Sequence, residues 1–376
     1  MPLRTTAIDL ARYRVATLEK GLQILELLER ASKPLSIQEI ARATAIQRVA
    51  VFRLLCTLER GGYVQRLESK KYRSTMRRRR ILIGYCAPLT GSSFRRALAA
   101  SIQRAARDSN VDLLAIDNRE DDSQEGLRSA QVLVDARVDL AMVFEPLQSI
   151  GVVVADRFFR AGIPFISIEV PLPGGVYFGA NNYQAGKLAG EVLAGFAAEH
   201  WKGRFDRVLL VESSAVGGNV QARLTGVLVG LREKLGVVDE SKVVHLDGRS
   251  HFETSREVVG TLLAGLPKGA HLLISGFNDQ TALGALQAVR AAQRERDVAI
   301  VGQNACEEGR EEIRNPASRF IASIAYFPER YGSRLIRLSQ SILNREPVPP
   351  AVYTEHVVLD RANIDEYYGT PLAGAG

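Results

Sequence analysis

The sequence contains few cysteines and histidines, and they are widely scattered. Its 376 residues include three cysteines and five histidines. Cys56, Cys86 and Cys306 are odd in number and far apart, which argues against a disulfide framework and favours small buried side chains. The histidines form no metal-ligand spacing with one another or with the cysteines, so no metal site is expected.

Long apolar stretches are also missing. No run reaches the roughly 18 to 20 apolar residues that span a bilayer. The first fourteen residues contain Asp9 and scattered arginines but no apolar core of a signal peptide. We therefore expect a globular protein that stays in the cytoplasm and has no membrane partner.

Motifs of common catalysts are absent as well. No glycine-rich phosphate loop with a Lys-Ser/Thr pair occurs. Ser213 and Ser214 are not part of a hydrolase motif that would pair a serine with a histidine and a carboxylate. Gly217-Gly218 has the pattern of an ordinary turn. A parallel-sheet protein can host catalysis without these motifs, but nothing here favours it. We expect neither an enzyme nor a bound cofactor.

What the sequence has in excess is positive charge, and this charge is confined to one end. The chain carries a net charge of +7. Residues 1 to 80 hold 18 Lys/Arg and 7 Asp/Glu, an excess of 11 positive charges, and the remainder has an excess of 4 negative charges. This asymmetry indicates a module that binds a polyanion, joined to a nearly neutral body. A basic tail without consequence is the alternative.

Apolar residues at helical spacing predict three short helices in the basic segment. The first carries leucines three and four positions apart over residues 18 to 28. The second begins at a capping box, in which Ser36 is the cap and Glu39 reaches back, and ends near Ala43. The third covers about residues 47 to 60. Two short helices, a tight turn and a third helix that opens with polar and basic residues describe a helix-turn-helix.

The third helix supplies the expected contacts with bases. Its first turns carry Gln47, Arg48, Ala50 and Arg53. Arginine can pair with guanine and glutamine with adenine in the major groove. We therefore predict that these four residues contact double-stranded DNA.

A β-hairpin pattern follows this helix. Gly61-Gly62 precedes a strand-like run at residues 63 to 67, a basic tip and a second run at residues 72 to 74. A hairpin in this position is a wing. Lys70 and Lys71 at its tip are expected to face phosphate, which strengthens binding without specifying sequence.

Several of these segments together resemble the winged helix of IclR-type regulators. They are residues 18–25 (LEKGLQIL), 36–43, 53–55 and 58–64 (LERGGYV). The resemblance covers residues 15 to 75 and implies a DNA-binding domain there. A three-helix core of another purpose stays open. Residues 1 to 14 are then an N-terminal arm, and residues 76 to 80, with four consecutive arginines, are a basic linker that is solvated or touches the DNA backbone.

From Ile81 onward, strand-like runs alternate with helical runs. The spacing is that of βαβ units with parallel sheets. One set ends near residue 168, and a second follows a helix near residues 183 to 200. Two sets in tandem predict two lobes with a cleft between them, where ligands bind beyond the carboxyl ends of the strands. The expected fold class is therefore α/β: a winged helix-turn-helix, a two-lobed domain over residues 81 to 366, and a flexible Gly/Ala-rich tail over residues 367 to 376.

The landmarks of this region resemble type I periplasmic sugar-binding proteins and the sensor domains of LacI-type regulators. The matching stretches are residues 163–169 (IPFISIE), 179–186 (GANNYQAG), 278–286 (NDQTALGAL), 301–304 (VGQN) and 322–326 (ASIAY). The resemblance covers about residues 80 to 345. It implies a type I periplasmic-binding-protein-like fold and a small-molecule effector, but no particular ligand.

The resemblance also implies a pocket, position by position. Phe94 takes the place of an aromatic residue that stacks on a sugar face. Glu169 takes the place of an aspartate that binds hydroxyl groups, and Gln221 takes the place of an arginine. The other expected lining residues are Phe144, Glu145, Asn181, Asn278, Asn304 and Tyr326.

Three pocket positions depart from the family pattern. Ser93 stands where the family has an aromatic, Gln221 replaces its frequent arginine and Asn304 its frequent aspartate. A ribose-like pocket is therefore not implied, although paired donors and acceptors still fit a polyol. The sequence shows no basic cluster at the cleft, so we expect a small, polar, uncharged ligand. Asn278 and Asn304 could instead be caps or turn residues, and Phe94 could be core.

These observations predict a transcription regulator that binds a specific DNA sequence under the control of a sugar or polyol. A homodimer or a dimer of dimers would place two winged helices on a two-fold operator. Repression and activation both stay open. One alternative is a solute-binding protein, cytoplasmic or related to transport, without DNA-binding regulation. Another is a regulator that responds to a polar metabolite or a phosphorylated compound.

Overall fold

The computed structural model describes residues 15–31, 33–75, 80–119 and 122–369, without the side chains of residues 219 and 220. The chain divides into two compact units, residues 1–80 and 81–376, and each is considered by itself. The expected N-terminal arm, most of the basic linker and residues 370 to 376 of the expected tail lie outside the described residues. Within the described part, no helix is long and apolar enough to cross a membrane.

The N-terminal unit consists of three helices and a two-stranded hairpin. Its elements are α1 (Ala16–Arg30), α2 (Ile37–Thr44), α3 (Arg48–Arg60), β1 (Val64–Arg66) and β2 (Tyr72–Ser74). One apolar core joins all five, because each helix turns one stripe inward. Its buried residues include Ile24, Leu28, Ile40, Val51, Leu55, Val64 and Tyr72.

Local contacts set the turns of this unit. Ser36 Oγ accepts a hydrogen bond from Glu39 N, and Glu39 Oε2 accepts one from Ser36 N at 2.7 Å, which confirms the capping box. Ala45 ends α2 in the left-handed region and turns the chain toward α3. Leu35 and Tyr72 exchange backbone hydrogen bonds, so the hairpin is tied to the segment before α2.

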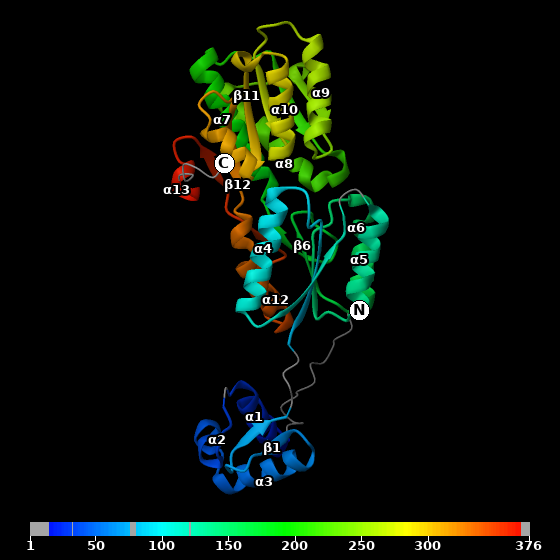
Figure 1. The fold of residues 1–376 in the computed structure, drawn as a ribbon, viewed down its shortest axis with the longest axis vertical. Coiled ribbons are helices and arrows are strands. Elements are labelled where there is room, and N and C mark those ends of the chain that lie inside the picture. Colours follow the sequence, from blue (N-terminus) through cyan, green and yellow to red (C-terminus); the bar gives the residue numbers. More distant parts are fainter. Residues whose placement is uncertain (1–14, 32, 76–79, 120–121, 370–376) are drawn as a thin grey trace, which may run out of the picture. The chain divides into compact units, whose positions relative to one another are not determined.

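The C-terminal unit has two lobes, each built on a six-stranded sheet (Figure 1). The sheet of the first lobe is parallel throughout, in the order β13-β7-β6-β5-β3-β4. Its strands are β3 (Leu82–Ala87), β4 (Asp112–Asp117), β5 (Leu140–Val143), β6 (Phe165–Ile168), β7 (Val176–Gly179) and β13 (Ala351–Tyr353). Its helices are α4 (Ser93–Asp108), α5 (Ser123–Asp135), α6 (Gln148–Ala161) and α12 (Tyr331–Leu343).

The sheet of the second lobe has the order β14-β12-β11-β10-β8-β9 and is parallel except for the β12–β14 pair. Its strands are β8 (Arg207–Glu212), β9 (Val243–Asp247), β10 (Leu272–Gly276), β11 (Val298–Asn304), β12 (Phe320–Ala325) and β14 (Val357–Asp360). Its helices are α7 (Asn182–Trp201), α8 (Gly218–Leu235), α9 (Phe252–Gly265), α10 (Asp279–Ala291), α11 (Glu307–Arg314) and α13 (Ile364–Tyr368). The central strands β5 and β10 are buried along their whole length, as expected for sheets with helices on both faces.

Three short segments connect the lobes, at residues 180–181, 326–330 and 354–356. The chain leaves the first lobe after β7, returns before α12 and crosses again between β13 and β14. Both sheets therefore contain a strand from the C-terminal part of the chain. The sequence reading missed β7, β13 and β14, which are only three or four residues long, and also the six-residue strand β12.

Helices α7 and α8 pack with their backbones in close approach, and this packing positions a residue of the cleft. A methyl group on Gly186 would lie 1.8 Å from the carbonyl oxygen of Arg223, and one on Gly190 would lie 2.1 Å from that of Val227. Only glycine fits at such separations. Because the two backbones touch, the position of Arg223 in α8 is determined by α7.

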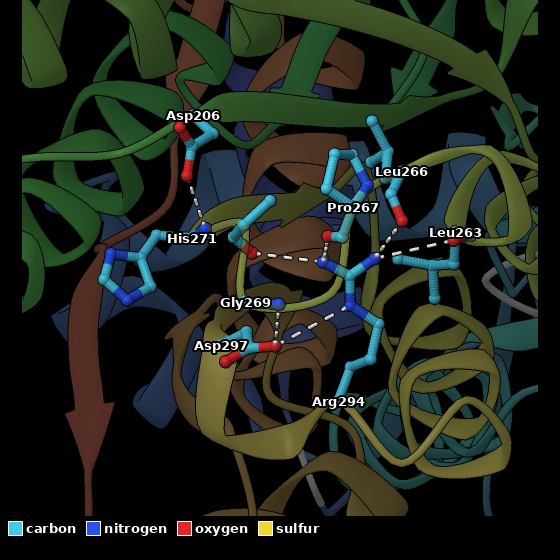
Figure 2. A network of polar contacts seen from close by, with 9 residues as sticks. Asp206, Leu263, Leu266, Pro267, Gly269, His271, Arg294 and Asp297 are labelled. Carbon is cyan, nitrogen blue, oxygen red and sulfur yellow. Dashed lines mark hydrogen bonds and ion pairs between the residues drawn. The ribbon is translucent and has the colours of Figure 1, made fainter.

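A buried arginine holds the loop that leads into β10 (Figure 2). The guanidinium of Arg294 donates hydrogen bonds to the carbonyl oxygens of Leu263, Leu266, Pro267 and Ala270, at 2.8 to 3.5 Å. Asp297 lies 3.8 Å from Arg294 Nε. One side chain therefore fixes the loop between α9 and β10.

The first two residues of the segment expected to be a flexible tail are helical. Tyr367 and Tyr368 belong to α13, and both rings lie against Phe327. The guanidinium of Arg310 also lies 4.0 Å from the ring centre of Tyr368. The expectation for these two residues was wrong because it weighed the Gly/Ala composition and not the aromatic pair.

Candidate functional site

The first candidate site is the exposed face of α3. Val51 and Leu55 turn inward, so residues on the opposite side of the helix face solvent. Gln47, Arg48 and Arg53 are exposed, and none of them occupies a core position.

Ala50 does not belong to this face. It is half-buried and packs against the core of the unit, because it lies one position before the inward-facing Val51. Val49 and Phe52 stand on the surface instead, with 73% and 46% of their area exposed. Sequence reasoning missed both, although apolar residues next to Arg48 and Arg53 on one helix face were a visible signal.

The hairpin adds a basic edge to this unit. Lys70 is exposed and Lys71 is half-buried. Arg66 and Arg73 are also exposed. Arg73 donates two hydrogen bonds to Gln65 Oε1, at 2.7 and 3.0 Å, so its guanidinium is held on the surface of the hairpin.

The second candidate site is a cleft between the two lobes of the C-terminal unit. It encloses about 760 Å³ of empty space, counting the part open to solvent. Six of the nine residues expected in the pocket line it: Phe94, Phe144, Glu169, Asn278, Asn304 and Tyr326. The sequence reading did not assign the other lining residues, among them Ser92, Arg95, Val170, Val216, Arg223, Arg249 and Phe277.

Aromatic and aliphatic side chains form an apolar surface across the cleft. Val170 from the first lobe packs with Val216 and Phe277 from the second, and Phe144 lies against this cluster. The ring of Phe94 meets that of Tyr331 edge to face, at 6.3 Å between centres. Such rings can stack on the C–H face of a small ring compound.

Glu169 is a buried carboxyl group at the carboxyl end of β6. It is 7% exposed and has a left-handed backbone conformation, with φ at 60°. Its Oε1 accepts a hydrogen bond from Tyr331 Oη at 2.6 Å. Burial raises the pKa of Glu169, and the opposing effects of Tyr331 and Arg223 are smaller.

Arg223 is the main lining residue that sequence reasoning missed. It is 5% exposed, and its Nε and Nη2 donate to Asn182 Oδ1 at 3.1 and 2.6 Å. Its Nη1 donates to the carbonyl oxygen of Phe277. The guanidinium lies 4.5 Å from the ring centre of Phe277 and 5.4 Å from that of Tyr326. These contacts fix its plane at the cleft wall.

Two asparagines line the same cleft, and they differ in whether their side-chain oxygen already accepts a hydrogen bond. Asn278 caps α10, because its Oδ1 accepts from Thr281 N at 2.8 Å, and its amide nitrogen donates to the carbonyl oxygen of Ser250. Asn304 ends β11 with φ at 86°. Its Oδ1 is buried and has no hydrogen-bond partner among the described residues, so it is the freer acceptor.

Three residues expected in the pocket do not line it. Glu145 is buried, and its carboxylate accepts hydrogen bonds from Asn118 Nδ2 and Leu147 N. Asn181 caps α7 through its Oδ1 and lies at a separate depression. Gln221 precedes Arg223 by two positions in α8, and two helical positions turn a side chain by about 200°. Arg223 therefore faces the cleft where the resemblance implied Gln221.

Contacts between the lobes hold the cleft closed on two sides. Ser93 Oγ of α4 donates to Glu308 Oε2 of α11 at 2.7 Å and accepts from Glu307 N at 3.1 Å. On the other side, a methyl group on Gly217 would lie 2.2 Å from the side-chain amide carbon of Gln148. The two lobes are therefore in direct contact at both of these places.

Both units match known families. Residues 83–347 match the periplasmic binding protein domain, and residues 17–68 match the IclR helix-turn-helix domain. The ribose import binding protein of Haemophilus influenzae is 26% identical over 252 residues, which cover 65% of this chain and 80% of that protein.

Solved structures share the fold of the C-terminal unit. A solute-binding protein of an ABC transporter from Agrobacterium vitis, with bound allitol, has a TM-score of 0.68 and 19% identity, over 76% of this chain and 97% of that one. A Mycobacterium smegmatis protein in complex with β-D-fucofuranose has a TM-score of 0.67 and 21% identity, over 76% and 93% of the two chains.

Proposed function

Because the chain belongs to the periplasmic binding protein domain family and carries an IclR-type helix-turn-helix before that domain, we propose that it is a ligand-responsive transcription regulator. The observation that carries this proposal is the presence of two candidate sites in one chain. One is an exposed helix with basic ends, and the other is a closed cleft lined by aromatic and polar residues. Neither site contains a recognisable catalytic arrangement, so we propose binding and not catalysis.

The proposed partner of the N-terminal unit is a double-stranded DNA operator. In this proposal Arg48 and Arg53 read guanine, and Gln47 reads adenine. Val49 and Phe52 lie on the same exposed face, where they fit thymine methyl groups. Lys70 and the neighbouring arginines of the hairpin are suited to phosphate.

The proposed effector is a small polar molecule of the carbohydrate class. Structures with the same fold contain allitol or fucofuranose, and the relative from Haemophilus influenzae is named a ribose import binding protein. In this chain, Phe94, Phe144 and Phe277 offer apolar surface, and Asn304 offers an acceptor for a hydroxyl group. Rings beside paired polar groups are the combination that a polyol requires.

We propose that lobe closure couples the two sites. The effector binds between lobes that touch through Ser93 and Glu308, so it favours the closed arrangement. A ligand can shift such an equilibrium only by its differential affinity for the two states. In a cytoplasmic homodimer, closure would change the spacing of two winged helices on a two-fold operator.

A gel shift of genomic DNA fragments with the purified full-length chain tests the proposal. We expect a complex that prefers particular sequences at moderate salt and that changes when a carbohydrate effector is added. Arg48→Ala with Arg53→Ala should abolish the complex but keep effector binding, and Phe144→Ala with Asn304→Ala should do the reverse. The matched control is Arg256→Gln, an exposed arginine of α9 outside both sites.

The second candidate is a solute-binding protein without regulation of DNA, which the transport-related names of the relatives favour. Binding of an effector with no sequence-preferring DNA complex at any salt concentration would support it and refute the regulator.

A further inference from the structure

The charges that line the cleft are mostly positive. Three guanidinium groups line it, those of Arg95, Arg223 and Arg249, and Glu169 is the sole acidic residue in the described lining. The sequence showed no such cluster, because the arginines come from α4, from α8 and from the loop after β9. Only the fold brings these three segments to one cavity.

Glu169 is a weak counter-ion for this charge. Its Oε1 already accepts a hydrogen bond from Tyr331 Oη, and the group is buried. Burial penalises the charged form of a carboxyl group. Glu169 therefore offsets little of the positive charge in the cleft.

The polar contacts of Arg223 are neutral groups. It donates to an amide oxygen, Asn182 Oδ1, and to a peptide carbonyl, that of Phe277. A guanidinium has five N–H donors, and these contacts use three of them. One N–H remains on each terminal nitrogen, and such donors bind a carboxylate or phosphate strongly.

Arg249 brings a second positive charge to the cleft from the loop after β9. Arg249 and Ser250 have left-handed conformations, with φ at 52° and 64°, and Arg249 N donates to Asp247 Oδ1. The carboxylate of Asp247 also accepts from Ser214 N and Oγ. The loop is therefore held by its backbone, while the exposed guanidinium of Arg249 lines the cleft.

The amino ends of three helices add to the positive electrostatic potential of the cleft. The cap residues of α4, α6 and α10, which are Ser92, Leu147 and Asn278, all line the cleft. The amino end of a helix carries a partial positive charge. Together with Arg223 and Arg249, these helix ends favour a ligand that carries negative charge.

We propose that the effector is an anionic polyol, either a sugar acid or a phosphorylated sugar, whose acidic group is bound by Arg223 and Arg249. Its hydroxyl groups are bound by the free acceptor of Asn304, and its apolar face packs against Phe144 and Phe277. This inference rests on the proposed function, because it assumes that the cleft holds the effector. It replaces the uncharged ligand that the sequence led us to expect.

Isothermal titration of the full-length protein with matched ligand sets tests the inference. Each set contains a hexose, its uronate, its aldonate and its 6-phosphate, and the sets cover several stereochemistries. One acidic member should bind at least about tenfold more tightly than its neutral parent, since hydrogen bonds to charged groups are the stronger ones. The uronate and aldonate arms distinguish a carboxylate from the phosphate of the 6-phosphate arm.

Arg249→Gln is the informative variant, because Arg249 is exposed and its loss should not disturb folding. It should weaken binding of the acidic member about tenfold more than it weakens binding of the neutral parent. Arg249→Lys should recover part of the loss, and Arg256→Gln should change nothing.

Two results would overturn the inference and leave the proposed function intact. One is a neutral hexose that binds as tightly as its acids and phosphate. The other is an acidic ligand whose affinity is the same in Arg249→Gln and Arg256→Gln. If no member of any set binds, the cleft is not a carbohydrate site, and both the inference and the proposed effector class are wrong.

Discussion

Replacement of Arg294 by methionine should destabilise the second lobe of the C-terminal unit. Arg294 is 4% exposed, and its guanidinium donates to four carbonyl oxygens of the segment 263–270 (Figure 2). Methionine keeps most of the apolar stem but removes all the donors. The loop that leads into β10 would then lose its anchor.

The size of the effect follows from the four contacts. The hydrogen bond to Pro267 is the shortest, at 2.8 Å, and the others range from 3.3 to 3.5 Å. A hydrogen bond to a charged group contributes about 1.5–3 kcal/mol, and the longer contacts contribute less. Removal of a buried cation returns part of its desolvation cost. We therefore expect a net loss of about 3 kcal/mol in the free energy of unfolding.

Trp201 provides a local readout, because it is the single tryptophan of the chain and its ring stacks on His271 at 4.4 Å. Urea unfolding followed by its fluorescence should show a lower midpoint for Arg294→Met. The matched control, Arg296→Met, replaces an exposed arginine two positions away and should change the stability by less than about 0.5 kcal/mol. Arg294→Lys should fall between the two, since an ammonium group reaches fewer carbonyls. Equal midpoints for the variants at 294 and 296 would refute the reasoning.

Three further predictions concern other parts of the chain. Ser36→Ala removes the cap of α2 and should lower the stability of the N-terminal unit by about 1 kcal/mol, measured by thermal unfolding, whereas Ser69→Ala in the exposed hairpin tip should not. Burial raises the pKa of Glu145 from 4.5 to about 7, so its protonated form favours the fold, and that stability is present below about pH 4.5 and lost as the pH rises through 7. Glu145→Gln should remove on the order of 2 kcal/mol of this pH dependence in denaturant titrations, and an unchanged pH profile would contradict the assignment. Gly186→Ala should prevent the close packing of α7 and α8 and cost about 3 kcal/mol or more, while Gly195→Ala, which meets only the distant end of Lys234, should be tolerated.

Most elements of the fold could be predicted because their signals are local. Apolar periodicity placed a helix at about residues 47 to 60, where α3 (Arg48–Arg60) lies, and a helix near residues 183 to 200, where α7 (Asn182–Trp201) lies. The capping box at Ser36 marked the start of α2. The short strands β7 and β13 have no such signal, since each owes its conformation to a partner strand far away in the sequence.

The candidate site could be predicted only in part, because its geometry depends on side-chain direction. Phe94, Glu169 and Tyr326 follow strands whose carboxyl ends meet at the cleft, so their positions follow from topology. The face of α8 that meets the cleft depends on its glycine contacts with α7, and that register separates Arg223 from Gln221. No pattern in the sequence predicts the register of α8 against α7, and none predicts that Arg95, Arg223 and Arg249 line one cleft.

The strand exchange between the lobes also has a consequence for synthesis on the ribosome. The N-terminal unit has its whole core once residue 75 has emerged, because that core is formed by its own helices and hairpin. The first lobe must wait for β13, which pairs with β7 from about 170 residues earlier, and the second waits for β14. Since contacts far apart in the chain form slowly and after the local ones, the proposed DNA reader is complete in a nascent chain that has not yet built its sensor. A translation product truncated before β13 would therefore retain an intact reader without control by an effector.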